Sequence, residues 1–166
     1  NIFKAVLTHA HAAADTLKEV RCLQNYAATS MGIAFSVTDW ANGYVIYGEQ
    51  PDLSDGKKVW CGGYRLTDMD NEVIRVRLTG LKPSTLYYYR IGADRIEYKD
   101  GYHIRITGNE EKPQIYSFRT AGKEVKPHFC VINDTHASWK AFNPTINKVM
   151  EIQPSCVIWN GDACNT

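Results

Sequence analysis

The sequence predicts a mainly β chain, in which an antiparallel β-sandwich is followed by a strand–helix–strand unit. First, apolar and polar residues alternate with period two in several segments between about residues 20 and 121. Second, this alternation stops at a linker, residues 122–127, which contains Gly and Pro and few apolar residues. Third, the continuous apolar runs HFCVIN and SCVIW follow the linker and enclose a helical pattern, as in a parallel sheet.

Composition and charge are those of a globular protein. The chain has 166 residues, 44% of them hydrophobic, and a net charge of +1. The charges are interspersed, so no basic surface for nucleic acid is expected, and no apolar run is long enough to span a bilayer. The cysteines are odd in number and lack C-x-x-C spacing, so we expect no disulfide framework: Cys22, Cys61, Cys130, Cys156 and Cys164.

Residues 1–19 form a separate N-terminal segment, whose alanine-rich part AHAAADTLKE is compatible with a short helix. The spacing of His9 and His11 leaves two interpretations open, a metal-binding pair and a mobile terminus. The chain begins at Asn1 instead of Met, so we expect the natural start of the protein to precede it.

Strands are predicted wherever apolar residues recur at every second position. The clearest examples are residues 31–37, 45–47, 74–78, 87–91 and 116–118. Arg75 and Arg77 alternate with apolar residues, so we expect them on the solvated face of a strand.

Residues 95–106 predict a β-hairpin with Asp100-Gly101 as a two-residue turn, in which both positions would need a positive φ. Tyr98 and Tyr102 flank that turn. They form either a ligand-stacking tip or a cross-strand packing pair.

The stretch LTGLKPSTLYYYRI carries a more specific signal. Its Leu81, Pro83, Thr85 and Tyr87 are spaced as in a tyrosine corner, where a buried tyrosine hydroxyl hydrogen-bonds to backbone a few residues upstream. This segment resembles the corner before the sixth strand of fibronectin type III and immunoglobulin-like sandwiches. VIYGEQPDL and IYSFRTAG resemble the third and last strands of that fold.

Residues 128–166 predict the strand–helix–strand unit. Asn143 and Pro144 have the chemistry of an N-cap and a first helical residue, and Pro154 ends the helix. The helix would present one mostly apolar face: Ile146, Val149, Met150 and Gln153. Strands joined in this way are parallel, with a right-handed crossover, and each is expected to be buried on both faces.

Each of these two strands runs into a carboxylate, Asp134 after the first and Asp162 after the second. Carboxyl ends of neighbouring parallel strands meet at one sheet edge, where backbones are about 5 Å apart. Carboxylates held so close repel unless a cation lies between them, and His136 adds an imidazole to the same loop. The alternative is that each Asp is a turn former.

The motifs D-T-H (134–136) and N-G-D (160–162) resemble the first two motifs of the calcineurin-like metallophosphoesterases. The preceding sandwich resembles the N-terminal domain of their purple acid phosphatase branch, and the resemblance extends over residues 20–166. It implies that residues 128–166 begin an α/β metallophosphoesterase domain. Purple acid phosphatases usually have D-x-G at the first motif, so His136 implies the absence of their tyrosinate–iron ligation.

The resemblance also implies roles for these residues. Asp134 and His136 would bind a first metal ion and Asp162 would bridge two, which would be Fe, Mn or Zn. A water between the metals would attack a phosphate ester in line. Asn165 would either support this site or cap a turn.

The later motifs of the family, Gly-Asn-His and Gly-His-x-His, do not occur in the sequence. We therefore expect a truncated and inactive part of a phosphoesterase whose incomplete domain exposes apolar surface and favours self-association. Proteins of this two-domain layout suggest a secreted, periplasmic or cell-envelope location.

An alternative of a different class is a non-catalytic sandwich that binds carbohydrate or peptide. It is motivated by aromatic residues that could be exposed, Trp40, Trp60 and Tyr64, although burial in the core is the commoner fate of such residues.

Overall fold

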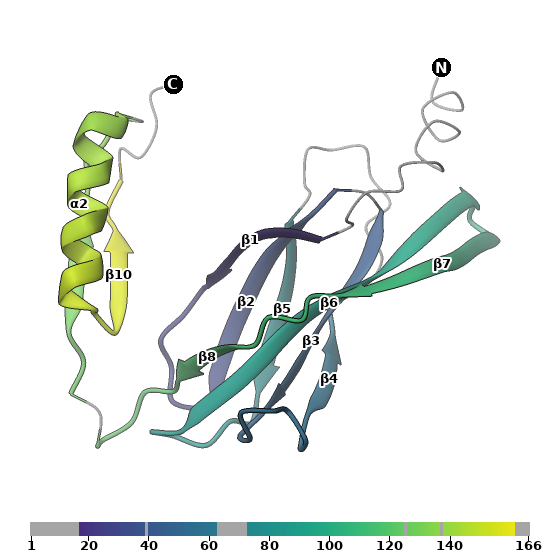
Figure 1. Ribbon diagram of the computed structural model, residues 1–166, viewed down its shortest axis with the longest axis horizontal. Coiled ribbons are helices and arrows are strands. Elements are labelled where there is room, and N and C mark those ends of the chain that lie inside the picture. Colours follow the sequence, from purple (N-terminus) through teal and green to yellow (C-terminus); the bar gives the residue numbers. More distant parts are fainter. Residues whose placement is uncertain (1–16, 39, 63–72, 125, 137, 162–166) are drawn as a thin grey trace.

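The computed structural model describes residues 17–38, 40–62, 73–124, 126–136 and 138–161. Their strands form two antiparallel sheets that face each other as a sandwich, and a separate parallel pair beyond them (Figure 1). The mainly β fold predicted from the alternation is confirmed. No helix among these residues is long and apolar enough to cross a membrane.

The first sheet has the strand order β1-β2-β5. Its strands are β1 (Leu17–Leu23), β2 (Ser30–Val37) and β5 (Val73–Thr79). In β5 the apolar residues are buried while Arg75 and Arg77 are exposed, so the prediction of a solvated arginine face is correct. The division predicted between residues 19 and 20 stays a prediction. Strand β1 begins at Leu17, whose buried side chain joins the core and which pairs with Val37 of β2.

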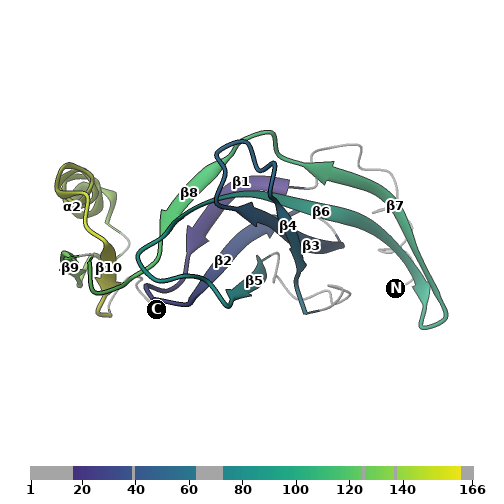
Figure 2. The same ribbon diagram turned by 90° about the horizontal axis from the view of Figure 1, so that it is seen from below.

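The second sheet has the order β4-β3-β6-β7, and β8 also pairs with β6. Its strands are β3 (Ala41–Gly48), β4 (Lys57–Trp60), β6 (Leu86–Asp100), β7 (His103–Glu111) and β8 (Tyr116–Arg119). Figure 2 shows the long curved β6 passing over the first sheet. The core between the two sheets is apolar and includes Met31, Ile33, Phe35, Val45, Ile74, Val76, Leu78, Tyr89 and Ile91.

The tyrosine corner predicted from residues 78–91 is present. The buried Tyr87 side chain directs its hydroxyl back to the turn, where it accepts a hydrogen bond from the Lys82 backbone N–H at 3.0 Å. This bond ties the start of β6 to the connection from β5.

The hairpin of β6 and β7 exists, but its turn differs from the prediction. Asp100 pairs with His103, so the turn residues are Gly101 and Tyr102, and neither Asp100 nor Gly101 has a positive φ. The reason is the Asp100 carboxylate, which accepts the Tyr102 backbone N–H at 2.9 Å and contacts His103 Nδ1 at 2.7 Å. Tyr98 packs edge-on against Trp40, with ring centroids 5.6 Å apart, and lies opposite Ile104. Tyr102 is 97% exposed, so the predicted cross-strand pair of Tyr98 and Tyr102 does not form.

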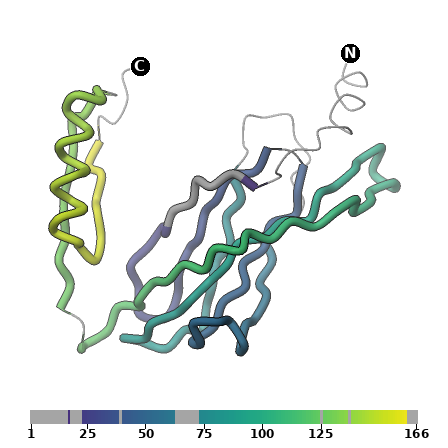
Figure 3. Tube along the Cα trace, in the orientation of Figure 1, coloured from purple at the N-terminus to yellow at the C-terminus, as the bar shows by residue number. Residues whose placement is uncertain are grey.

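The C-terminal unit consists of β9 (Phe129–Ile132), α2 (Trp139–Ile152) and β10 (Cys156–Trp159). β9 and β10 are neighbours and parallel, as predicted. Figure 3 follows the chain as it leaves β8 and enters this unit beside the sandwich.

Helix α2 begins earlier than predicted, with Ser138 instead of Asn143 as N-cap. The Ser138 carbonyl accepts the Phe142 backbone N–H at 2.8 Å, and the Phe142 ring stacks on Trp159 with centroids 5.5 Å apart. This contact with β10 favours an added helical turn, whereas Pro144 removes only one hydrogen bond from inside the helix. The helix ends at Ile152, two residues before Pro154, as expected.

The prediction that both parallel strands are buried on both faces is wrong for this chain. Helix α2 covers the face that carries Ile132 and Trp159. On the other face Phe129 and Val131 are 57% and 58% exposed, because no second layer lies over them among the described residues. Met150 is also exposed, so it does not belong to the apolar face predicted for the helix.

Candidate metal site

The ends of the two parallel strands lie side by side, held by backbone hydrogen bonds that continue past the strands. The Asn160 N–H donates to the Ile132 carbonyl at 2.8 Å, and the Asp134 N–H donates to the Gly161 carbonyl at 3.3 Å. The loop after β9 is therefore fixed against the loop after β10. Gly161 has a φ of 97°, a conformation that favours glycine.

Asp134 and His136 lie in the loop after β9, and their side chains meet. His136 Nε2 contacts Asp134 Oδ1, and both side chains are largely exposed. Thr135, between them, is buried and anchors the loop. The predicted carboxylate and imidazole thus share one surface, while the intervening residue points inward.

The backbone of this loop is unusual. Asp134 has a φ of 61° and His136 a φ of 46°, in the left-handed region that non-glycine residues seldom adopt. Each such residue costs on the order of 1 kcal/mol, and these conformations are common in loops that direct side chains toward a ligand. Sequence reasoning did not predict this feature, since Asp tolerates the region but His gives no signal for it.

Asp162 and Asn165 lie outside the described residues, so their predicted roles remain predictions. Within the described residues, no group of three or more His, Cys, Asp and Glu side chains could hold a metal ion. Asp134 and His136 supply one oxygen and one nitrogen ligand of the kind that divalent metals accept. The described residues therefore fit part of a metal site, and any further ligand must come from elsewhere.

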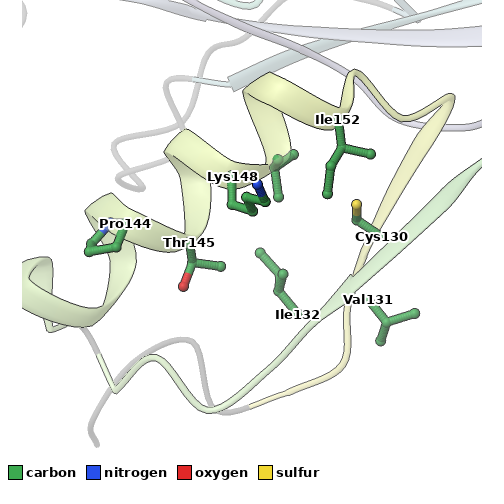
Figure 4. A pocket seen from close by; sticks show the side chains of 8 residues that line it. Cys130, Val131, Ile132, Pro144, Thr145, Lys148 and Ile152 are labelled. Atoms are coloured by element: carbon green, nitrogen blue, oxygen red, sulfur yellow. The ribbon is translucent and has the colours of Figure 1, made fainter.

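A pocket of about 440 Å³ lies between α2 and β9 (Figure 4), and Asp134 and His136 are not among the residues that line it. Most of the side chains that line it are apolar, and Lys148 is the charged one. Figure 4 shows Cys130, Ile132 and Ile152 facing this space. It lacks convergent polar groups, so it is better explained as loose packing between the helix and β9 than as a substrate site.

The Cys61 thiol lies 3.3 Å from Asn42 Oδ1, and the thiols of Cys130 and Cys156 are free. Cys130 and Cys156 are half-buried in the apolar strands, which agrees with a packing role. Cys164 lies outside the described residues, as do His9 and His11.

The aromatic residues of the alternative function differ in their surroundings. Trp60 is partly exposed and packs edge-on against Tyr44, with centroids 4.8 Å apart, and Lys58 Nζ lies 3.9 Å from the centre of the Tyr44 ring. Trp40 instead packs against Tyr98 of the hairpin, and Tyr64 lies outside the described residues.

Comparison with protein families gives one match. The family described as purple acid phosphatase, N-terminal domain, matches residues 20–120. The chain belongs to this family. The match extends over the sandwich and ends before β9, so it confirms the predicted domain resemblance and leaves the metallophosphoesterase part a prediction.

A search of curated proteins finds no match. Similar solved structures include a computer-redesigned β-sandwich protein that is 22% identical, with a TM-score of 0.40. The similarity covers 63% of this chain and 94% of the redesigned protein. The sensor domain of the anti-sigma factor RsgI4 from Pseudobacteroides cellulosolvens is 17% identical, with a TM-score of 0.40. The similarity covers 68% of this chain and 78% of the sensor domain.

The structure of PhoD is 12% identical, with a TM-score of 0.42, and the similarity covers 70% of this chain and 22% of PhoD. The three likenesses have TM-scores below 0.5, so the assignment depends on the family match.

Proposed function

We propose that the intact protein hydrolyses phosphate esters with the help of bound metal ions, and that Asp134 and His136 are ligands of one of them. The observation that carries this proposal is the meeting of two strand ends. The Asp134 N–H and the Gly161 carbonyl are 3.3 Å apart, and Asp162 is joined to Gly161 by one peptide bond.

The proposal assigns a role to each residue of the loop after β9, from Asp134 to His136. Asp134 and His136 provide ligand atoms, and buried Thr135 holds the loop in place. Asp162 is assigned as a shared ligand from the neighbouring strand end. Metal ions of the Fe, Mn or Zn type would supply Lewis acidity toward the phosphate ester. Membership in a family of phosphatase N-terminal domains supports this assignment.

Metal binding by the chain itself is the first test. Calorimetric titration with Mn²⁺ or Zn²⁺ should detect an ion whose affinity falls at least about tenfold in Asp134→Asn or His136→Ala. Asp52→Asn is the matched control, because Asp52 is an exposed carboxylate that bonds only locally, to the Ser54 N–H at 3.0 Å. Equal affinity in all variants would contradict the assigned ligands.

Activity of the intact protein is the second test. It should hydrolyse an aryl phosphate in the presence of Mn²⁺ or Zn²⁺ and lose this activity in Asp162→Asn, whereas the chain of residues 1–166 should show no turnover. Full activity of Asp162→Asn would contradict the shared-ligand role. Gly-Asn-His and Gly-His-x-His motifs in the protein after Thr166 are expected under the same proposal.

A second candidate function is recognition of carbohydrate or peptide by the sandwich, favoured by the partly exposed Trp60 beside Lys58 and Tyr44. In that case Trp60→Ala should abolish binding to an oligosaccharide or peptide array that retains the unmodified chain, and Trp139→Ala should not. If the same array also retains the Asp134→Asn variant, recognition by the sandwich does not depend on the proposed metal ligand.

A further inference from the structure

Three aromatic side chains form a row at the end of the C-terminal unit that carries the candidate metal ligands. Trp139, the first residue of α2, packs edge-on against Phe142, with ring centroids 5.6 Å apart and 86° between the ring planes. Phe142 stacks on Trp159, the last residue of β10, with centroids 5.5 Å apart and 21° between the planes. This aromatic row therefore connects the start of the helix with the end of the second strand.

Both ends of the aromatic row adjoin the loops of the candidate site. The start of α2 and the end of β10 lie at the same end of the unit (Figures 1 and 3). The Ser138 N–H donates to the Thr135 carbonyl at 2.8 Å, so the helix begins directly from the loop after β9. At the other end of the row, Trp159 precedes the loop whose Gly161 carbonyl accepts the Asp134 N–H. The aromatic rings and the candidate ligands thus share one edge of the unit.

The outermost ring of the row is held in place and yet open to solvent. Trp139 is 73% exposed, whereas Phe142, which lies between it and Trp159, is half-buried. A tryptophan that serves packing gains most of its free energy by burying its large apolar surface, and Trp139 buries little of it. The contact with Phe142 restricts the Trp139 side chain, which lowers the entropy cost of binding a planar group to the exposed ring.

The first turn of α2 favours a negatively charged ligand beside this ring. Residues 139–142 include no acidic residue, and Lys140 adds a positive charge with an exposed side chain. Within the part of the chain that the structure describes, the N-cap Ser138 makes no capping hydrogen bond through its side chain. Backbone N–H groups and the helix dipole at such a start attract anions. An anion with an aromatic substituent therefore suits the start of α2 better than a neutral ligand does.

We propose that Trp139 is a stacking platform for the planar group of an aromatic phosphate ester, either a phenyl ring or a nucleobase. This inference rests on the proposed function, because the phosphate of such an ester would bind to the metal ions held by Asp134 and His136. Phe142 and Trp159 position the platform and do not touch the substrate. The candidate ligands leave the substrate class open, and Trp139 narrows it to esters with a ring that can stack.

Steady-state kinetics of the intact protein with Mn²⁺ test the platform on pairs of esters that differ in the planar group. Trp139→Ala should raise KM at least about fivefold for phenyl phosphate, for adenosine monophosphate or for both, because each can stack on the ring. The KM for methyl phosphate and for ribose 5-phosphate should stay the same. A change for one aromatic ester alone identifies its ring as the group that stacks.

Two further variants separate stacking from a general effect on α2. Trp139→Phe keeps an aromatic ring and should restore the KM for the aromatic ester to within about twofold of the unmodified protein. Met150→Ala is the matched control, because Met150 is also a large apolar residue of α2, 69% exposed, and lies outside the aromatic row. It should leave every KM unchanged.

Binding without turnover gives a second readout. Phenylphosphonate and methylphosphonate have a carbon–phosphorus bond in place of the ester, so calorimetric titration of the intact protein with Mn²⁺ measures their affinity alone. Trp139→Ala should weaken phenylphosphonate at least about fivefold and leave methylphosphonate unchanged. The affinity for Mn²⁺ itself should not change in Trp139→Ala, in contrast to Asp134→Asn.

The outcomes distinguish the platform from the proposed function. Equal losses for the aromatic and the methyl ligand in Trp139→Ala, or no loss for either, would overturn the platform even where Asp134→Asn abolishes metal binding and activity. An intact protein that binds neither Mn²⁺ nor the phosphonates would contradict the proposed function, and the platform with it.

Discussion

The sandwich and the C-terminal strand–helix–strand unit bury their apolar side chains to different degrees. In the sandwich, side chains from two sheets meet in a continuous core, of which Phe35 and Ile91 are typical. In the C-terminal unit, Ile132 is the one buried apolar side chain among the described residues, and α2 has none. A sheet with apolar residues on both faces needs a layer on each side, and this unit has a layer on one.

The largest expected difference concerns two phenylalanines. Phe35→Ala in the sandwich should lower the free energy of unfolding by about 3–5 kcal/mol, because it leaves a cavity in the core. Phe129→Ala in β9 should change it by less than about 0.5 kcal/mol, since its side chain is already exposed. Urea denaturation followed by circular dichroism measures both. A large effect of Phe129→Ala would mean that the outer face of β9 is covered in solution.

A change at the helix–sheet contact should affect the C-terminal unit alone. Phe142→Ala removes the ring stacked on Trp159 and should destabilise that unit by about 2 kcal/mol. Hydrogen exchange of residues 139–152 should accelerate, while the urea midpoint of the sandwich stays the same. Met150→Ala, on the exposed side of α2, is the control. A lower sandwich midpoint in Phe142→Ala would show that the two regions unfold together.

The tyrosine corner should contribute less than the core but more than any surface tyrosine. Tyr87→Phe leaves the Lys82 N–H without its acceptor and should cost about 1–2 kcal/mol of sandwich stability. Tyr102→Phe, at the exposed tip of the β6–β7 hairpin, should cost nothing measurable. Chemical denaturation of both variants compares them directly. Equal denaturation midpoints would show that the tyrosine corner does not stabilise the sandwich measurably.

The smallest expected effect is a change in the pH dependence of sandwich stability below about pH 5. The backbone N–H groups of Glu49 and Gln50 donate to the Asp55 carboxylate and hold its pKa below the usual value. A lowered folded-state pKa stabilises the fold above the unfolded-state pKa of about 3.9, and this contribution is lost as the pH falls through the folded-state value. Asp55→Asn should therefore lose less stability than the unmodified chain between about pH 5 and 2. Thermal denaturation over this pH range measures the loss, and an equal loss of stability in Asp55→Asn and the unmodified chain would contradict the prediction.

Local sequence patterns predicted the structure correctly where one local rule, such as strand alternation, determines where the side chains lie. The alternation of β5 determined which side chains face the core, and the spacing of Leu81 to Tyr87 determined the tyrosine corner. The order of apolar runs and helix also determined that β9 and β10 are parallel neighbours. It placed Asp134 at the carboxyl end of β9, where the structure has it.

The errors arose where a tertiary contact outweighed a local signal. Asn143 and Pro144 have good helix-start chemistry, yet stacking of Phe142 on Trp159 moves the start of α2 to Trp139. In the hairpin, the Asp100 carboxylate accepts the Tyr102 N–H, and the turn shifts by one residue. Such contacts link residues through a geometry that periodicity does not contain.

The sequence by itself determined the sandwich, its face alternation, the family resemblance and the candidate ligands Asp134 and His136. Only the tertiary structure decided that these two side chains meet above a buried Thr135, in a left-handed backbone conformation. It also decided that β9 is covered on one face. The physical reason is that periodicity reports which side chains avoid water, whereas the partner that covers them depends on how distant segments pack.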